Sequence, residues 1–302
     1  MSSNVQSVVC CLGDPVAGNP TQFLMQRAAA AQSLDWMFVT AEVPECRIKE
    51  AFQGIRALRF SGVAFLPPHQ TAGAKLVDSV TEAALRSGHV RIARRDGDLW
   101  LGDDSLGTAI VELVDFHSDS GAIQNERRGE QGLFVVTGLP WLAQLVRLSL
   151  TSERSGQMRE LVESADAIAE PKAELPSDEL QATPTLIQSP NIDSNATVKP
   201  LTFDDAAKSD GIIDTLVVDS AAECPSAKIL AKFKWSETPT IVFVEPNPRW
   251  EHGLDSIGIP NAKILRPLDV AGAKAIVNFN FWTGYKTDFA FVRESLDEYC
   301  QW

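Results

Sequence analysis

The chain begins with an alternation of short apolar runs and longer stretches in which apolar residues recur at helical spacing. The apolar runs predict strands at residues 5–12, 35–43 and 62–66. The stretches between and after them predict helices at 21–33, 44–59 and 71–86. Two apolar runs around Asp96-Gly97 predict a β-hairpin, because this dipeptide suits a two-residue turn. Strands separated by helices of this length indicate a largely parallel sheet.

A second series of elements follows. The pattern predicts a helix at 106–116, a strand at 132–138, a helix at 141–150, strands at 215–220 and 240–246, and helices at 269–282 and 288–299. Between about 170 and 210, prolines stand among Ser, Thr, Asn, Asp and Glu with few large apolar residues. That composition predicts a loop or a partly disordered insertion. The whole pattern therefore indicates an α/β protein with an interruption in its second half.

Length and composition narrow the class of protein. A chain of 302 residues with 44% hydrophobic and 22% charged residues is typical of a soluble protein of about two domains. The formal net charge of −13 disfavours binding to nucleic acid or to anionic lipid. No apolar run approaches the ~18–20 residues that cross a bilayer, and the N-terminus lacks the features of a signal peptide. We therefore expect a cytoplasmic protein without nucleic acid or membrane partners.

The cysteines give no sign of a metal site. The sequence has 5 cysteines without Cys-x-x-Cys spacing, which indicates buried free thiols in a reducing compartment. No metal is expected, and a homodimer is kept open because nothing in the sequence decides the oligomeric state.

The segment "GVAFLPPHQ" (62–70) is the first candidate for a functional site. Its apolar part predicts a buried strand, and two prolines end the strand and present His69 and Gln70 just beyond it. In α/β proteins, ligands bind outside the carboxyl ends of the strands. His69 either contacts a ligand there or caps the strand end, and the second interpretation is favoured.

Several collinear segments resemble the shikimate dehydrogenase family. "LGDPVAGNPTQFLMQRAAAAQSLDWMFVTAEV" is similar to the opening strand, substrate loop, helix and second strand, and "FSGVAFLPPHQ" to the strand that ends in Ile-Pro-His-Lys. "DGDLWLGDDSLGTAI" is similar to the hairpin closing in Gly-x-Asn-Thr-Asp-Gly. "VFVEPNPRW" resembles the segment ending in Tyr-Asn-Pro-x-x-Thr, and "VNFNFWTG" resembles Gln-Phe-x-x-Trp-Thr-Gly. The likeness spans most of residues 12–299 and thins between about 124 and 236.

The resemblance implies a two-domain α/β fold. Residues 1–105 match a substrate-binding domain, onto which the C-terminal residues from about 284 to 302 would pack back. Residues 106–283 match a degenerate Rossmann-like domain that carries the insertion at 170–210. Members of the family oxidise the ring hydroxyl of shikimate by hydride transfer to NADP, and a lysine and an aspartate handle the proton.

Both residues of that proton-transferring pair are replaced in this sequence. Gln70 stands at the position of the lysine, and an amide orients a hydroxyl but does not accept its proton. Leu106 stands at the position of the aspartate, preceded by Asp104 and Ser105. A one-residue slip of the alignment would bring Asp104 to the site, so Asp104 is kept as a reserve catalytic candidate.

The residues that would hold the substrate differ as well. Asn19 and Thr21 stand in the substrate loop, and Ala64 and Leu66 replace hydrogen-bonding residues on the third strand. Arg91 replaces an asparagine and Lys274 a glutamine, so Thr21, Arg91 and Lys274 are candidates for an anion site that takes a small carboxylate. The alternative is that Arg91 and Lys274 pair with carboxylates of this acidic chain.

The glycine-rich loop that would hold the dinucleotide phosphates is reduced to Gly138. Leu139, Pro140 and Trp141 follow it, and proline removes a backbone donor. We therefore expect no cofactor, or NADP if the activity of the family survives.

Three functions stay open. The leading interpretation is a catalytically impaired or inactive relative that keeps the scaffold for small-molecule binding or for regulation near aromatic amino acid biosynthesis. The second is an active NAD(P)-dependent oxidoreductase of another hydroxy acid, with Asp104 or Tyr285 as the proton-transferring group. The third is a small-anion binder without a nicotinamide cofactor.

Overall fold

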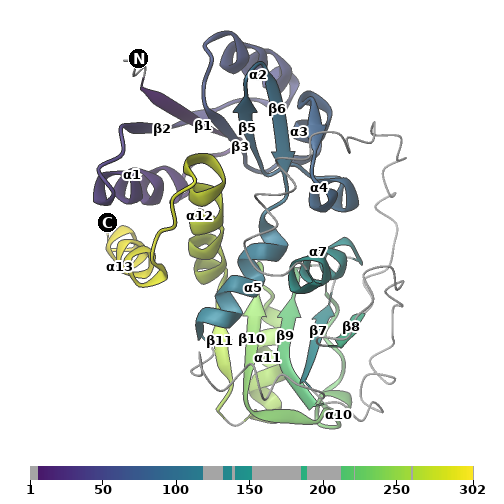
Figure 1. Ribbon diagram of the computed structural model, residues 1–302. Helices are drawn as coiled ribbons and strands as arrows, with labels where there is room; N and C mark the ends of the chain where they lie inside the picture. Colours follow the sequence, from purple (N-terminus) through teal and green to yellow (C-terminus); the bar gives the residue numbers. More distant parts are fainter. Residues whose placement is uncertain are drawn as a thin grey trace. The chain divides into compact units, whose positions relative to one another are not determined.

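Two β-sheets organise the described residues of the computed structural model, which are 6–117, 132–137, 140–151, 185–188, 212–220, 222–259 and 261–301 (Figure 1). The chain divides into two compact units. The first contains the described residues up to Ser105 and from Ala271 onward, and the second contains those between Leu106 and Val270. The chain thus returns to the first unit at Ala271, earlier than residue 284, from which the sequence resemblance implies that the C-terminal residues pack back. The assignment of separate domain functions to these parts stays a prediction.

The sheet of the first unit has the strand order β2-β1-β3-β5-β6-β4 within the described residues. Its strands are β1 (Ser7–Gly13), β2 (Trp36–Glu42), β3 (Gly62–Phe65), β4 (Ser79–Val80), β5 (Ile92–Asp96) and β6 (Leu99–Asp103). β1 is parallel to β2 and β3, whereas β5 runs antiparallel to both β3 and β6. The carboxyl ends of β1, β3 and β6 and the amino end of β5 therefore meet at one edge of the sheet.

Helices cover both faces of this sheet. Successive strand residues point to opposite faces, so a strand that is apolar throughout has side chains to bury on both. The helices on one face are α1 (Thr21–Ala31), α12 (Pro267–Thr283) and α13 (Phe289–Tyr299). The helices on the other face are η1 (Glu45–Arg47), α2 (Ile48–Ala57), α3 (Gln70–Leu76) and α4 (Glu82–Ser87). Along β1, Val9 and Cys11 belong to the first core, and Cys10 and Leu12 belong to the second. The strand is buried on both faces, as its continuous apolar run predicts.

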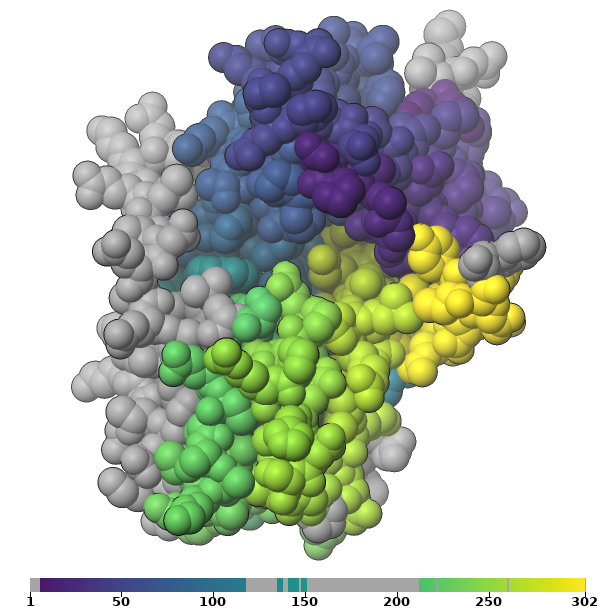
Figure 2. Space-filling model, turned by 180° about the vertical axis from the view of Figure 1, so that it is seen from behind, coloured from purple at the N-terminus to yellow at the C-terminus, as the bar shows by residue number. Residues whose placement is uncertain are grey.

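The end of the chain completes the first core. Trp282 packs over Gly62, where a Cβ atom would lie 2.5 Å from the indole ring, and its Nε1 donates to the carbonyl oxygen of Ala93 at 3.0 Å. Arg27 of α1 forms an ion pair of 2.7 Å with Glu298 of α13. Figure 2 shows the C-terminal residues in yellow against the N-terminal residues in purple.

The helix predicted at 71–86 is wrong as a single element. The structure has α3, then the short strand β4, then α4. β4 pairs with β6, and Thr81 caps α4 by accepting a hydrogen bond from the amide of Ala84. The apolar spacing alone favours one helix over 71–86. The pairing of β4 with β6 and the helix cap at Thr81 interrupt that helix.

The sheet of the second unit has the order β11-β10-β9-β7-β8 within the described residues. Its strands are β7 (Gly132–Thr137), β8 (Thr185–Gln188), β9 (Ile212–Val218), β10 (Trp235–Phe243) and β11 (Lys263–Leu265). Its helices are α5 (Leu106–His117), α7 (Pro140–Thr151), α10 (Ala227–Leu230) and α11 (Pro248–Ile257). β7, β9, β10 and β11 are parallel, and β8 is antiparallel to β7.

β8 corrects the prediction of an unstructured insertion at 170–210. Its residues add an edge strand to the sheet, and the rest of that stretch lies outside the described residues. The apolar part of β8 is too short for a periodicity to show, so the surrounding prolines dominate the sequence pattern. None of the helices in the described ranges is long and apolar enough to cross a membrane.

Candidate functional site

The candidate site lies in the first unit, at the edge where β1, β3 and β6 end and β5 begins. Backbone hydrogen bonds connect these ends. Phe65 N donates to Arg91 O at 2.8 Å, Arg91 N donates to Asp103 O at 2.9 Å, and Val90 N donates to Gln70 O at 3.0 Å. Several residues identified from the sequence, namely Gln70, Arg91 and Asp104, are thus brought to one edge.

His69 has a structural role at this edge. It is fully buried, it precedes the first residue of α3, and its Nε2 lies 2.8 Å from the carbonyl oxygen of Val43. This contact connects the end of β3 with the end of β2, so His69 fastens the strand ends, as the favoured interpretation expects.

Neither Gln70 nor Leu106 has a side chain that could transfer a proton, and their correspondence to the proton-transferring pair stays a prediction. Gln70 begins α3 and is half-buried, and its amide does not titrate in a useful range. Leu106 begins α5 and is only 3% exposed, so an apolar side chain occupies the other position.

Arg91 and Asp104 form a buried ion pair. Arg91 Nε donates to Asp104 Oδ1 at 2.8 Å, and the two side chains are 12% and 0% exposed. The alternative that Arg91 pairs with a carboxylate of this chain is therefore what the structure shows. Asp104, the reserve catalytic candidate, is engaged by a guanidinium.

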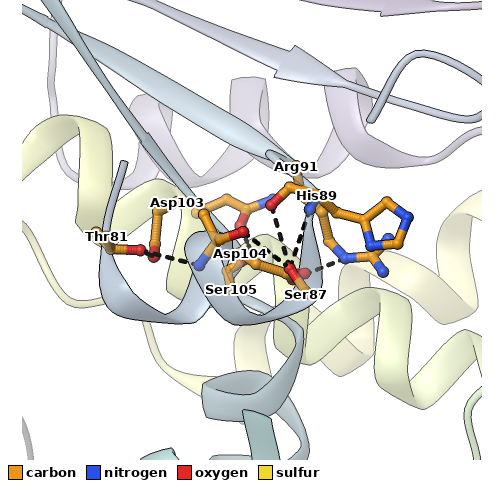
Figure 3. Close-up of polar contacts among 9 residues, drawn as sticks. Thr81, Ser87, His89, Arg91, Asp103, Asp104 and Ser105 are labelled. Carbon is orange, nitrogen blue, oxygen red and sulfur yellow. Dashed lines mark hydrogen bonds and ion pairs between the residues drawn. The ribbon is translucent and has the colours of Figure 1, made fainter. Parts of the chain in front are cut away.

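Asp103, the neighbour of Asp104, is a second buried acid that the sequence reasoning missed. The hydroxyl of Thr81 donates to its carboxylate (Figure 3). Burial raises the pKa of Asp103 to about 6, with a further increase from the charge of Asp104, while the Thr81 hydrogen bond and Arg94 act in the opposite direction. The consecutive acids at the end of the apolar strand "LWLG" were the available signal.

A polar contact ties the same corner to α12. Ser105 Oγ donates to Asn278 Oδ1 at 2.6 Å, and both residues are buried. This bond fixes the chain directly after the two acids. The sequence likeness covers both residues, but their pairing required the fold.

The floor next to these polar residues is apolar. Ala64 and Leu66 pack with Ala275 and Phe279 of α12 in the first core. Any hydroxyl of a ligand that pointed at this floor would lose its hydrogen bonds, at a cost of roughly 1–3 kcal/mol for each unpaired group.

The remaining candidates for ligand binding lie on α1, before it and on α12. Asn19 Oδ1 accepts a hydrogen bond from Thr21 N at 2.9 Å, which shapes the turn into α1. Lys274 lies half-buried in the middle of α12. The convergence of Thr21, Arg91 and Lys274 on one anion stays a prediction.

Two described features of the second unit differ from the usual dinucleotide site, and the absence of a bound dinucleotide stays a prediction. Gly138 lies outside the described residues, but α7 begins at Pro140, which has no amide hydrogen to offer a phosphate. The neighbour of β7 on its outer side, β8, is antiparallel. In a doubly wound fold the strand at this position is parallel, and a residue at its carboxyl end binds the ribose of the nucleotide by a hydrogen bond.

Asn247 organises the carboxyl edge of this second sheet. Its Nδ2 donates to the carbonyl oxygens of Asp219, Ser220 and Ala222 at 2.9, 3.3 and 3.1 Å. Its Oδ1 accepts from the amide of Trp250 and caps α11. The amide thus binds two loops together, a role that the Asn-Pro pair at the start of a helix signals only in part.

Comparisons with known proteins agree with this architecture. No protein-family model matches the chain. A shikimate dehydrogenase (NADP(+)) of Geobacter metallireducens is 31% identical over 121 residues, which are 40% of this chain and 42% of that enzyme, so the match spans less than half of the relative's length.

Solved structures match over much more of the chain. The shikimate dehydrogenase of Thermus thermophilus, solved with NADP(H) and shikimate, covers 97% of this chain and 100% of its own, with a TM-score of 0.60 and 15% identity. A 5-ketofructose reductase of Gluconobacter sp. strain CHM43 covers 98% of this chain and 99% of its own, with a TM-score of 0.61 and 16% identity.

These matches confirm the predicted α/β fold of shikimate dehydrogenase type, with one sheet in each half of the fold. Sequence similarity covers part of the chain and structural similarity covers nearly all of it. The chain is therefore similar to shikimate dehydrogenases in part of its sequence and in its overall fold.

Proposed function

We propose that this protein binds a small carboxylate in its first unit and does not carry out the NADP-dependent oxidation of the shikimate dehydrogenases. The observation that supports this most directly is the composition of the strand edge. Gln70 and a buried Leu106 stand where a proton-transferring pair would be needed, and Asp104 is ion-paired with Arg91.

The chemistry of hydride transfer explains why this observation matters. Oxidation of a hydroxyl requires a group within hydrogen-bond reach that accepts its proton near neutral pH. An amide and an alkyl side chain do not accept one, so the two replaced positions contribute nothing to this step. The remaining polar residues at the edge suit recognition of a charged group.

The second unit supports the same proposal. The proline at the start of α7 and the antiparallel strand β8 disfavour a bound dinucleotide in the usual place. The cofactor of the Thermus relative is NADP(H), and the proposed function dispenses with it.

Calorimetric titration of the whole protein with NADP+ and NADPH tests this proposal. We expect a dissociation constant weaker than about 1 mM for both nucleotides, and no NADPH formed from NADP+ in the presence of shikimate or quinate. Micromolar binding together with turnover would overturn the proposal. A thermal-shift screen of shikimate, quinate, acetate and benzoate identifies the carboxylate.

Asp103 favours a second candidate function, an oxidoreductase with a rearranged site. A buried carboxyl with a pKa of about 6 holds and releases a proton in the range of a general acid or base. Turnover that is lost in Asp103→Asn and retained in Asp98→Asn, a substitution of an exposed acid, would establish this alternative.

A further inference from the structure

The Arg91–Asp104 ion pair has an asymmetry that bears on ligand binding. Solvent reaches 12% of the Arg91 side chain and none of the Asp104 side chain. A ligand that approaches this edge therefore has access to part of the Arg91 side chain and none to the Asp104 side chain. The backbone next to the pair is fixed, since Arg91 N donates to the carbonyl oxygen of Asp103, the residue before Asp104.

Two neighbouring polar side chains at this corner are engaged elsewhere. Asp103 accepts the hydrogen bond of Thr81 (Figure 3), and Ser105 donates to Asn278. The charge of Arg91 is thus balanced by Asp104 at 2.8 Å, through a hydrogen bond of the charged type.

A carboxylate from a ligand would make the same kind of contact with Arg91 that Asp104 makes. Guanidinium groups prefer carboxylates because their planar arrays of N–H donors match the two oxygens. Compensation of a buried guanidinium charge by an anion is favourable, so loss of the Asp104 charge weakens this compensation and favours the binding of another anion.

We propose that Asp104 is a built-in counter-ion that occupies Arg91 in place of a ligand carboxylate and thereby sets the affinity of this edge for small carboxylates. This inference rests on the proposed function, because it concerns the same class of ligand. It adds that Arg91 is the recognising residue and Asp104 its competitor.

Substitution of Asp104 by asparagine tests the inference. Asn keeps the size of the side chain and an oxygen that accepts from Arg91 Nε, but it removes the charge. We expect calorimetry to show that Asp104→Asn binds acetate about tenfold or more tightly than the wild-type protein. The double variant Arg91→Gln/Asp104→Asn is expected to lose this gain.

Asp98→Asn is the matched control. Asp98 is 95% exposed and pairs with Arg59 at 3.6 Å, so its substitution changes the net charge equally without touching the site. An equal gain in Asp98→Asn, or no gain in Asp104→Asn, would overturn the inference.

A second measurement covers the outcome in which Asp104→Asn is poorly folded. Urea unfolding is followed in acetate and in chloride of equal concentration, because an anion that binds only the folded state raises its stability. We expect acetate to raise the unfolding midpoint of Asp104→Asn more than chloride does. Equal effects of the two anions would refute the inference.

The two proposals fail separately. NADP-dependent turnover by the wild-type protein would refute the proposed function and leave the acetate result intact. Unchanged acetate binding in Asp104→Asn would refute the counter-ion inference and leave the absence of turnover intact.

Discussion

Two consecutive acids at the end of β6 meet burial in different ways. Asp104 is 2% exposed and is paired with a guanidinium, whereas Asp103 is 3% exposed and accepts a hydrogen bond from a hydroxyl. Burial is the largest cause that raises the pKa of Asp103 to about 6, and the hydrogen bond from Thr81 offsets it only in part. The two neighbouring acids thus have partners of different charge.

The raised pKa of Asp103 predicts a dependence of stability on pH. The folded state binds the proton more tightly than the unfolded state, whose pKa is close to 3.8, so stability is lost as the pH rises from about 4 to about 6. Two units of pKa correspond to about 3 kcal/mol. We expect the free energy of unfolding of Asp103→Asn, relative to wild type, to increase by that amount between pH 4 and pH 7.

Urea unfolding of both proteins at several pH values measures this difference. Asp98→Asn serves as the surface control and is expected to follow the wild-type profile. A constant difference between Asp103→Asn and wild type across this pH range would contradict the prediction.

The burial of Leu106 bears on an experiment in which the lysine and aspartate of the related enzymes are introduced by substitution. The double substitution Gln70→Lys/Leu106→Asp is expected to restore no turnover, because the proposed function has no bound nucleotide to accept the hydride. A carboxylate in place of a leucine that is 3% exposed is expected to lower the free energy of unfolding by about 3 kcal/mol or more. The favourable position at the start of α5 returns only about 0.3–1 kcal/mol.

Spectrophotometry at the NADPH absorbance band and urea unfolding check both parts, with Leu106→Asn as the neutral control. Turnover in the double variant would show that cofactor binding survives.

At the scale of elements, the local sequence pattern predicts the helices and strands that depend on that pattern alone. It does not predict elements that form only by pairing with a segment distant in the sequence. Apart from β4, the strands of the first sheet, including the hairpin at Asp96-Gly97, follow from the sequence, since each combines an apolar run with a turn signal. β4 was missed because it exists through pairing with β6. At the site, the likeness to a known family located Arg91 and Asp104, but the ion pair between them follows from the antiparallel pairing of β5 and β6.

The second unit shows a signal that was present but not used. Asn247-Pro248 carries an N-cap residue followed by proline at the first helical position, which is typical of a helix start. The three carbonyl contacts of Asn247 could not be foreseen, because they depend on how the loop after β9 returns toward α11.

The contacts of Asn247 predict how much the junction between the loop after β9 and α11 contributes to the free energy of unfolding. Asn247→Ala removes a helix cap and leaves buried carbonyl groups without their donor, so we expect a loss of about 2–4 kcal/mol in the free energy of unfolding. Asn247→Asp keeps the cap but not the donors, and it separates the two contributions. Urea unfolding of the three proteins measures them, and an equal stability of Asn247→Ala and wild type would refute the assignment.

At the scale of the whole molecule, the first unit is discontinuous in sequence. Its core joins Leu24 and Phe38 near the start of the chain to Phe279 and Leu296 near the end. The matched solved structures have the same overall fold at about 15% sequence identity. Fold similarity alone therefore does not carry the activity of the relatives to this protein.

Trp282 is the residue through which this closure is best tested. It is 7% exposed, packs on Gly62 and bonds to Ala93, so it connects α12 to β3 and β5. Trp282→Ala creates a large cavity, and we expect a loss of about 3–5 kcal/mol in the free energy of unfolding. Trp282→Phe keeps most of the packing and loses one hydrogen bond, worth about 0.5–1.5 kcal/mol. We expect hydrogen exchange in Trp282→Ala to accelerate in β1 alone, because β9 belongs to a separate core. Equal acceleration in β1 and β9 would contradict this expectation, because it would show that the two units unfold together.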